Sequence, residues 1–320
     1  MKILKFIFCA TLALSVVTSA HSEGFKKDDL KNKVTDKISS FKSEKINQYS
    51  TEISDGISSF LKENLSSMKY LDFQVDLREE TKPTFSIMSV NEITELANGG
   101  TIFNQTSFNT YDGDETINIG LGARKLLNDN KVIIGFNTFY DHQFSENHKR
   151  IGLGAEAITS MLDLRGNYYN AMSGRKAVKT GDYLERALDG WDVRADYHLP
   201  ILSDVNFYVK AFEFKNPEEA SDFREKGNKF GLDAKVGNFS IEGGYMNDNQ
   251  DKDAYFGSIK YVVKFGSGKQ EKLCAGQLIK DCISEKTFKD VSDQLYQPVK
   301  RENKIRVVKI DASGVVVGGF

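Results

Sequence analysis

The chain has 320 residues, of which 28% are charged and 40% are hydrophobic. This composition excludes an intrinsically disordered chain and a collagen-like fibre. Lys and Arg number 43 against 45 Asp and Glu, and the net charge of −2 provides no strong attraction to nucleic acid. The 26 Gly, 22 Phe and 13 Tyr beside 4 Pro and 1 Trp indicate a strand-rich protein with much aromatic surface.

The first residues have the pattern of a Sec signal peptide. Lys2 and Lys5 precede an apolar stretch over residues 6–17, and small residues such as Ala20 and Ser22 follow it. We therefore expect a signal peptide over residues 1–22 and a mature chain that is exported. A retained anchor helix is the alternative interpretation.

Residues 23–67 are predicted to form a periplasmic helical segment. Apolar residues recur there in steps of three and four, as expected for an amphipathic helix: Ile46, Tyr49, Ile53, Ile57 and Phe60. Such a narrow stripe also suits a coiled coil or docking on a neighbour, so a homodimer through this helix is a further hypothesis.

From Lys69 the hydrophobic period changes to two, which is the period of a β-strand. Leu71, Phe73 and Val75 alternate with polar residues, and the same pattern recurs along residues 68–265. About twelve such strands of about ten residues each are expected, the length that a tilted strand needs to cross a bilayer. The predicted fold class is all-β, a twelve-stranded antiparallel transmembrane β-barrel.

The polar face of these strands carries charges of both signs, whereas the other face is nearly free of charge. We predict that the polar face lines the lumen of the barrel. The predicted lumen residues are Arg124, Asp141, Glu156, Arg165, Asp192, Arg194, Asp196, Asp233 and Lys235. Gly120, Gly122, Gly152 and Gly154 lie inside strands, where the absent side chains are expected to leave room for a chain in the lumen.

The predicted connections alternate between tight and long. Those around residues 98–99 and 129–130 are tight, whereas residues 173–189 and 216–227 form the two longest. A barrel whose two ends both lie in the periplasm has short turns inside and long loops outside. We therefore expect residence in the outer membrane of a Gram-negative bacterium, with loops at the cell surface and contacts to outer-membrane lipid and lipopolysaccharide.

The last strand presents one regular face of apolar and aromatic residues. These are Tyr255, Gly257, Ile259, Tyr261, Val263 and Phe265. Such a strand is typical of the targeting signal that the outer-membrane barrel assembly machinery reads, after delivery by periplasmic chaperones.

Several motifs, in order, resemble the inverse autotransporter β-domain of the intimin and invasin family. They are residues 118–124 (NIGLGAR), 135–141 (GFNTFYD), 148–156 (HKRIGLGAE), 190–194 (GWDVR) and 296–305 (YQPVKRENKI). The resemblance covers about residues 64–309 and is fairly specific because several motifs keep their spacing.

The resemblance implies that residues 266–320 thread back through the lumen and emerge as a short exported tail. Tyr296, Arg301, Asn303 and Ile305 match the family's threading segment. The implied function is a translocator and anchor for the chain's own C-terminal segment. We expect no folded passenger in these residues, and neither a peptidoglycan-binding LysM module nor an adhesive domain. The alternative is a small porin-like diffusion channel.

Neither a catalytic nor a metal site is expected. His142 and His148 flank a short loop whose polar residues are expected to be solvated, and His198 alternates into the lumen. His148 and Arg150 also lie on the family pattern, and this resemblance implies a structural role for them. None of the histidines lies near a recognisable nucleophilic Ser, so the sequence does not predict an enzyme or a cofactor.

Cys274 and Cys282 are predicted to form a small disulfide loop, with two free thiols or an intermolecular bond as alternatives. We expect the paired Cys274→Ser, Cys282→Ser variant to migrate differently from the wild type in electrophoresis without reductant. Identical mobility of the two proteins would contradict the disulfide, and reduced samples provide the control.

Overall fold

The structure, a computed structural model, describes residues 67–78, 84–97, 99–111, 114–178, 183–199, 205–218, 222–236, 239–250, 253–264, 289–311 and 316–319. The predicted signal peptide, the helical segment up to residue 66, Phe265 and both candidate disulfide cysteines lie outside these ranges. Among the described residues, no helix is long and apolar enough to cross a membrane.

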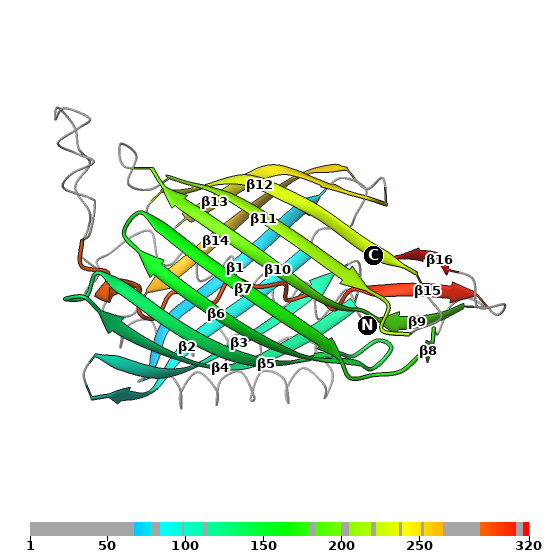
Figure 1. The fold of residues 1–320 in the computed structure, drawn as a ribbon, viewed down its shortest axis with the longest axis horizontal. Helices are drawn as coiled ribbons and strands as arrows, with labels where there is room; N and C mark the ends of the chain where they lie inside the picture. The colour runs from blue at the N-terminus through cyan, green and yellow to red at the C-terminus, as the bar shows by residue number, and fades with distance from the viewer. Residues whose placement is uncertain are drawn as a thin grey trace, which may run out of the picture. The chain divides into compact units, whose positions relative to one another are not determined.

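Antiparallel strands, strongly tilted, close into a twelve-stranded barrel, which confirms the predicted fold class (Figure 1). Each strand pairs with its neighbours in the chain, except that β7 pairs with β10, and β14 pairs with β1 to close the ring. The strands are β1 (Met68–Arg78), β2 (Thr84–Leu96), β3 (Gly100–Tyr111), β4 (Asp114–Leu127), β5 (Val132–Gln143), β6 (His148–Thr159), β7 (Leu162–Ala171), β10 (Asp189–His198), β11 (Val205–Lys215), β12 (Arg224–Val236), β13 (Phe239–Asp248) and β14 (Ala254–Lys264).

The two ends of the barrel differ in their connections. The tight-turn end holds the links after β2, β4, β6, β10 and β12, and the long-loop end holds the others. In the tight turn after β4, Asn128, Asp129 and Asn130 adopt φ values of 50°, 53° and 65°. Asn and Asp tolerate this left-handed region, so the turn is compatible with its sequence.

The outer wall is apolar with aromatic side chains near both ends, as expected of a barrel in a bilayer. Near the long-loop end the exposed aromatic residues include Tyr140, Tyr168, Trp191 and Tyr255, and near the tight-turn end they include Phe136, Tyr197 and Phe207. Aliphatic side chains lie between them, among them Leu121, Leu153, Leu164, Val193, Leu232 and Ile259. The alternation along each strand therefore separates a lipid-facing surface from the lumen.

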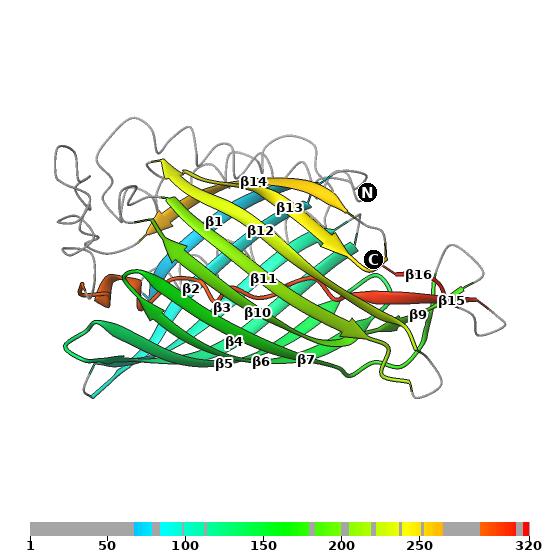
Figure 2. The ribbon, with the colours of Figure 1, turned by 45° about the horizontal axis from the view of Figure 1, so that its top comes forward.

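A second, small sheet stands at the long-loop end. Its order is β16 (Val316–Gly319), β15 (Val307–Asp311), β9 (Tyr183–Ala187) and β8 (Lys176–Ala177). Strands β8 and β9 belong to the long connection between β7 and β10, whereas β15 and β16 come from the C-terminal part of the chain. Figures 1 and 2 both show residues 289–311, orange to red, running inside the barrel from the tight-turn end to this sheet.

The prediction that strand glycines leave room for a threaded chain agrees with Gly152, where an added Cβ atom would lie 3.0 Å from Arg301 Nη2 of the C-terminal segment. It is wrong at Gly154, where a Cβ atom would lie 2.5 Å from Asn137 of the wall, and at Gly120 and Gly122. A Cβ atom added to Gly120 would lie 2.3 Å from the Phe139 ring, and one added to Gly122 would lie 2.3 Å from the Phe103 ring. Aromatic rings of the neighbouring strands β5 and β3 therefore fill the space. The two glycines thus make room for these rings. The Phe139 ring in turn packs against the guanidinium of Arg301 in the C-terminal segment.

We expect Gly122→Val to lower the free energy of unfolding by about 1–3 kcal/mol, because the new side chain overpacks against Phe103. The measurement is urea unfolding of the barrel in lipid, followed by heat-modifiable electrophoretic mobility. Gly243→Val is the matched control, since the nearest atom to a Cβ there is 3.9 Å away on the outer wall. Equal stability of both variants would contradict the packing argument.

Candidate functional site: the threaded lumen

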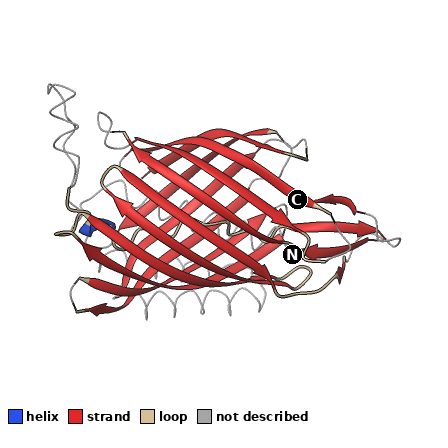
Figure 3. Cartoon of the chain, in the orientation of Figure 1, coloured by secondary structure: helices blue, strands red, loops and turns tan. Residues whose placement is uncertain are grey.

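Residues 289–311, here called the tail, cross the lumen mostly without regular secondary structure. The tail begins with the short 3-10 helix η2 (Ser292–Gln294) and becomes a strand only at β15 (Figure 3). Its backbone donors and acceptors need partners other than a sheet ladder. Side chains of the barrel wall provide many of them.

The tail is first fixed at the tight-turn end. The backbone N–H of Val291 donates to the carbonyl of Asn130, in the turn after β4, at 2.8 Å. The Val291 side chain is fully buried and packs with Ile133 and Ile158. The start of the tail is therefore held against β5 and β6.

Arg124 of β4 is buried and holds the next turn of the tail. Its Nη1 donates to the carbonyls of Leu295 and Gln297 at 2.7 and 2.6 Å, and its Nε donates to Glu156 at 2.8 Å. Its guanidinium lies 4.6 Å from the centre of the Phe103 ring. One wall side chain therefore satisfies two tail carbonyls while its own charge is neutralised.

Two further contacts complete this level. The backbone N–H of Val299 donates to Gln105 Oε1 at 2.7 Å, and Gln105 Nε2 donates back to the Val299 carbonyl at 3.3 Å. The Tyr296 hydroxyl donates to Glu92 Oε2 at 2.6 Å and lies 3.0 Å from the Thr101 hydroxyl. Side chains of β2 and β3 thus bind the same part of the tail as Arg124 does.

A buried carboxylate of the wall binds the next part of the tail. Asp141 of β5 accepts two parallel hydrogen bonds from Arg301 of the tail, at 2.8 and 2.7 Å. It also accepts one from Arg150 of β6 at 2.8 Å and one from Asn118 of β4 at 2.7 Å. Arg301 additionally lies 4.2 Å from the centre of the Phe139 ring. Asp141 is fully buried, so its charge depends on these partners.

The same two wall residues also bind the tail backbone. Arg150 donates to the carbonyls of Glu302 and Lys304 at 2.6 and 2.8 Å, and Asn118 donates to the carbonyl of Asn303 at 2.9 Å. Three consecutive tail carbonyls are therefore satisfied by two side chains. This arrangement replaces the ladder that a strand would supply.

The β7–β10 wall binds the tail through a second acidic centre. Lys300 Nζ lies 2.8 Å from Asp196 Oδ1, and Arg165 Nη1 lies 2.9 Å from Asp196 Oδ2. Arg165 also pairs with Asp163 at 2.9 Å, and Arg194 pairs with Asp196 at 2.7 Å. Adjacent tail residues, Lys300 and Arg301, thus engage carboxylates on different parts of the wall.

At the long-loop end the tail is held by Arg306 and by strand pairing. Arg306 forms an ion pair with Glu225 of β12 and another with Glu302 at 3.2 Å. Its guanidinium lies 4.5 and 4.7 Å from the rings of Phe212 and Phe214. Beyond it, β15 pairs with β9 along its whole length, from Val307 to Asp311.

The predicted lumen residues occupy two kinds of position. Most have buried side chains that bind the tail, the wall or one another: Arg124, Asp141, Glu156, Arg165, Asp192 and Asp196. Arg194 is partly buried and binds Asp196. Asp233 is half-buried and accepts a hydrogen bond from Ser240 at 2.6 Å, whereas Lys235 is exposed near the tight-turn end. No contact of Asp233 or Lys235 with the described tail residues is present.

The other predicted residues are placed as follows. Tyr296, Arg301 and Asn303 contact the wall as described, and Ile305 packs with Ala187 and Val307. In β14, Tyr255 and Ile259 are exposed on the outer wall, with Gly257 on the same face. Tyr261 belongs to that face by strand parity and pairs with Phe73 and Phe239; the side chain of Val263 lies outside the described residues.

Sequence reasoning did not single out Asn118, Arg150, Gln105 or Arg306 as residues that hold the tail. Asn118 and Arg150 lie inside the recognised motifs, at positions where the alternation points inward. Their inward direction and their hydrogen-bond donors could therefore have identified them as residues that bind a chain in the lumen. Gln105 and Arg306 carry no comparable signal, because their role depends on where the tail crosses them.

His148 is not solvated, and its position agrees instead with the structural role that the family pattern implies. Its side chain is fully buried, with Nδ1 3.0 Å from the Ser173 hydroxyl and Nε2 3.7 Å from Glu185 Oε2. His198 faces the lumen side as expected and lies 2.7 Å from Asn206 and 3.2 Å from Asp163.

The two longest loops are joined by an ion pair outside the barrel. Arg175 of one loop binds Glu218 of the other at 2.5 Å, and Arg186 lies 3.5 Å from the same carboxylate. The hydrogen bond from Arg175 lowers the pKa of the Glu218 carboxyl. The pair is partly exposed, so we assign it to loop positioning rather than to stability.

We expect Arg301→Gln to lower the free energy of unfolding by about 3–5 kcal/mol, because it removes one partner of a buried ion pair. The measurement is urea unfolding in lipid. Asp141→Asn and the double variant complete a double-mutant cycle, in which the double variant should recover part of the loss. Additive effects of the two single changes would show that the residues do not interact.

Comparison with known proteins matches this architecture. The model of the family described as "Inverse autotransporter, beta-domain" matches residues 19–303. The chain is 41% identical over 100 residues to the "Putative attaching and effacing protein homolog" of Escherichia coli (strain K12), covering 31% of this chain and 34% of that protein. It is 33% identical over 119 residues to "Invasin" of Yersinia enterocolitica, covering 37% of this chain and 14% of Invasin.

The chain thus matches 34% of the length of the first relative and 14% of the second, so the similarity concerns only a part of each. A solved structure, reported under "Unveiling the Mechanism Behind the in-meso Crystallization of Membrane Proteins", shares the fold with a TM-score of 0.62 and 19% identity. The match covers 75% of this chain and 99% of that one. On the family match and the threaded twelve-stranded barrel together, the chain belongs to the inverse autotransporter β-domain family.

Proposed function

We propose that this outer-membrane barrel anchors its own C-terminal segment in the lumen and carries it to the cell surface. The observation that supports this most directly is the path of the tail. Val291 is bound at the tight-turn end, Arg301 in the middle, and β15 joins a sheet at the long-loop end. Outer-membrane barrels have short periplasmic turns and longer extracellular loops, so the tail runs from periplasm to surface.

The same contacts support a closed lumen over the alternative of a diffusion channel. Charged tail side chains reach carboxylates on several strands: Arg301 to β5, Lys300 to β10 and Arg306 to β12. Wall side chains of β3 and β4 approach from the other side. A chain bound on so many sides occupies the central path that ions and small solutes would need.

An enzymatic function has little support. Ser173, His148 and Glu185 form a series that resembles a hydrolase triad. However, all three side chains are buried, and the Ser173 hydroxyl also accepts a hydrogen bond from the backbone N–H of Lys149 at 3.2 Å. A substrate carbonyl has no access to a nucleophile in this position, so we assign the series to structure.

The partners are those of an outer-membrane barrel. The exposed face of β14, with Tyr255 and Ile259, supports recognition of the last strand by the barrel assembly machinery, after delivery by periplasmic chaperones. Homodimerisation through residues 23–67 remains a hypothesis from the helical stripe in the sequence.

We expect an epitope appended after Phe320 to be labelled on intact cells, as is an epitope inserted after Lys179 between β8 and β9. The reason is that both positions follow segments at the long-loop end. Labelling of the loop epitope alone would contradict threading and favour the channel. A periplasmic epitope, visible only in permeabilised cells, controls for membrane integrity.

We further expect low conductance of the intact protein in planar bilayers and a large increase after deletion of residues 266–320, because the tail fills the lumen. Arg301→Gln should give intermediate or fluctuating conductance. Equal conductance of the intact and the deleted protein would contradict the plug.

A further inference from the structure

We propose that the outer wall over β6, β7 and β10–β12 is a binding site for lipid A, the phosphorylated glycolipid of the outer leaflet. Acyl chains would lie in two adjacent grooves beside Trp191. A phosphate would contact the cations Lys215, Arg224 and Lys226 at the long-loop rim.

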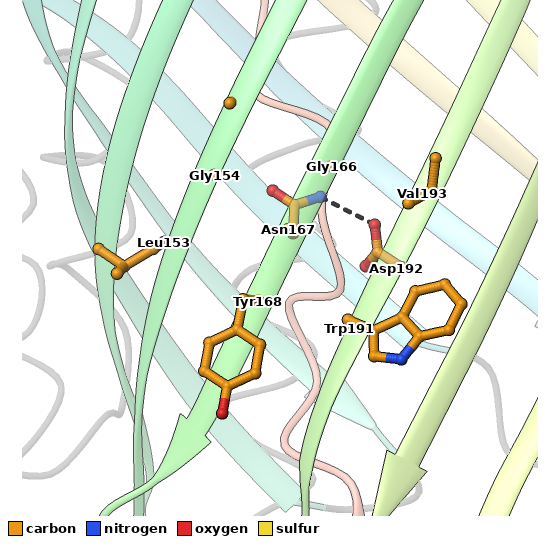
Figure 4. A pocket seen from close by; sticks show the side chains of 9 residues that line it. Leu153, Gly154, Gly166, Asn167, Tyr168, Trp191, Asp192 and Val193 are labelled. Atoms are coloured by element: carbon orange, nitrogen blue, oxygen red, sulfur yellow. Dashed lines mark hydrogen bonds between the residues drawn. The ribbon is translucent and has the colours of Figure 1, made fainter.

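The first groove has a volume of about 480 Å³ and lies on the lipid-facing wall. Figure 4 shows Leu153 of β6 on one side of β7, and Trp191 and Val193 of β10 on the other. Tyr168 of β7 stands directly opposite Trp191 in the strand register and closes the end toward the rim. The groove is therefore apolar along its length, with an aromatic border near the headgroup region.

A glycine keeps this groove open. Gly166 pairs with Ala155 on one side and with Val193 on the other, so the two small residues Ala155 and Gly166 lie side by side in a row that Val193 borders. A Cβ atom added to Gly166 would meet nothing within 4 Å. An outer wall without such a row would be filled by its own side chains.

The second groove, of about 430 Å³, lies on the other side of Trp191 and nearer the rim. Ala211 forms its floor, and Lys226, Asn228 and Asn247 border it with polar groups. The carboxylate of Glu213 also lines this groove and binds Arg224 at the rim at 3.2 Å. An acyl chain beside Trp191 would thus pass from an apolar groove to one that offers an ammonium and amide donors. This order matches a lipid whose headgroup carries phosphate.

The cations at the rim have few partners of their own. Lys215 and Arg224 stand directly opposite each other in the β11–β12 register, an unfavourable arrangement for two like charges. Arg224 binds Glu213 at 3.2 Å. The registers also place Asp189 opposite Lys215 and Glu213 opposite Lys226, although neither lysine has a carboxylate of the described residues within ion-pair distance. The three cations therefore exceed the two carboxylates beside them by one charge. An anion placed between these side chains would relieve the repulsion.

The position of the site along the barrel axis indicates which lipid it binds. The cations lie at the end of the barrel that faces the cell surface, and the grooves extend from there toward the middle of the wall. Lipid A carries phosphates above several acyl chains in that leaflet, so it can fill both grooves and neutralise the cations together. A free phosphate would leave the grooves empty.

Trp191 is the single tryptophan of the chain and provides the signal for a test. The full-length protein, freed of lipopolysaccharide and held in zwitterionic detergent, is titrated with lipid A while Trp191 fluorescence is recorded. Neutralising Lys215, Arg224 and Lys226 with Gln should weaken binding by about fivefold per cation, or about a hundredfold together. Lys125→Gln, an exposed outward lysine near the tight-turn end, is the matched control and should bind as the wild type does.

Gly166→Leu tests the groove independently, because it fills the floor without changing a charge, and it should weaken lipid A binding. Heat-modifiable mobility verifies that every variant is a folded barrel.

Unchanged affinity in the triple variant would overturn the proposal. So would equal affinity for phosphatidylglycerol, which would indicate general anion attraction, or the same response to inorganic phosphate alone. Unchanged affinity of Gly166→Leu would refute the acyl groove.

Discussion

The structure depends on the charge of one buried carboxylate. Asp141 binds Arg150 of the wall and Arg301 of the tail, so the threaded segment neutralises a charge that the barrel has already placed out of water. Removing one partner from such a centre costs several kcal/mol, whereas the complete set is stable. The barrel interior and the tail are therefore matched electrostatically, since Arg301 of the tail adds two hydrogen bonds to those that Arg150 and Asn118 of the wall donate to Asp141.

The tail keeps its place although it forms no sheet inside the lumen. Wall side chains, above all Arg124, Arg150 and Asn118, donate to five tail carbonyls in two groups, while the tail's own side chains bind carboxylates on separate strands. The contacts that anchor the tail are thus the contacts that close the lumen. The same interactions therefore hold the tail in place and fill the lumen. Strand β15 adds backbone hydrogen bonds to β9 at the long-loop end.

The two faces of the wall use the alternation of each strand for different purposes. On β7, Asn167 and Tyr169 face the lumen and bind Asp192, whereas Gly166 and Tyr168 face lipid. The inner positions are fixed by hydrogen bonds and charge, so they are densely partnered. The outer positions face the hydrocarbon of the bilayer, so most of them are apolar. The cations Lys215, Arg224 and Lys226 on β11 and β12 are exceptions at the long-loop rim.

The sequence by itself determined the strand period, the short and long connections and which charged side chains face inward, because the direction of a side chain in a strand follows from its parity alone. Only the tertiary structure decided which charges meet. Parity does not give the height of a residue or its partner across the lumen, so the pairing of Asp141 with Arg301 and the burial of His148 could not be predicted. The role of Gly122 was likewise decided by a neighbouring strand, whose Phe103 ring takes the space that the glycine leaves.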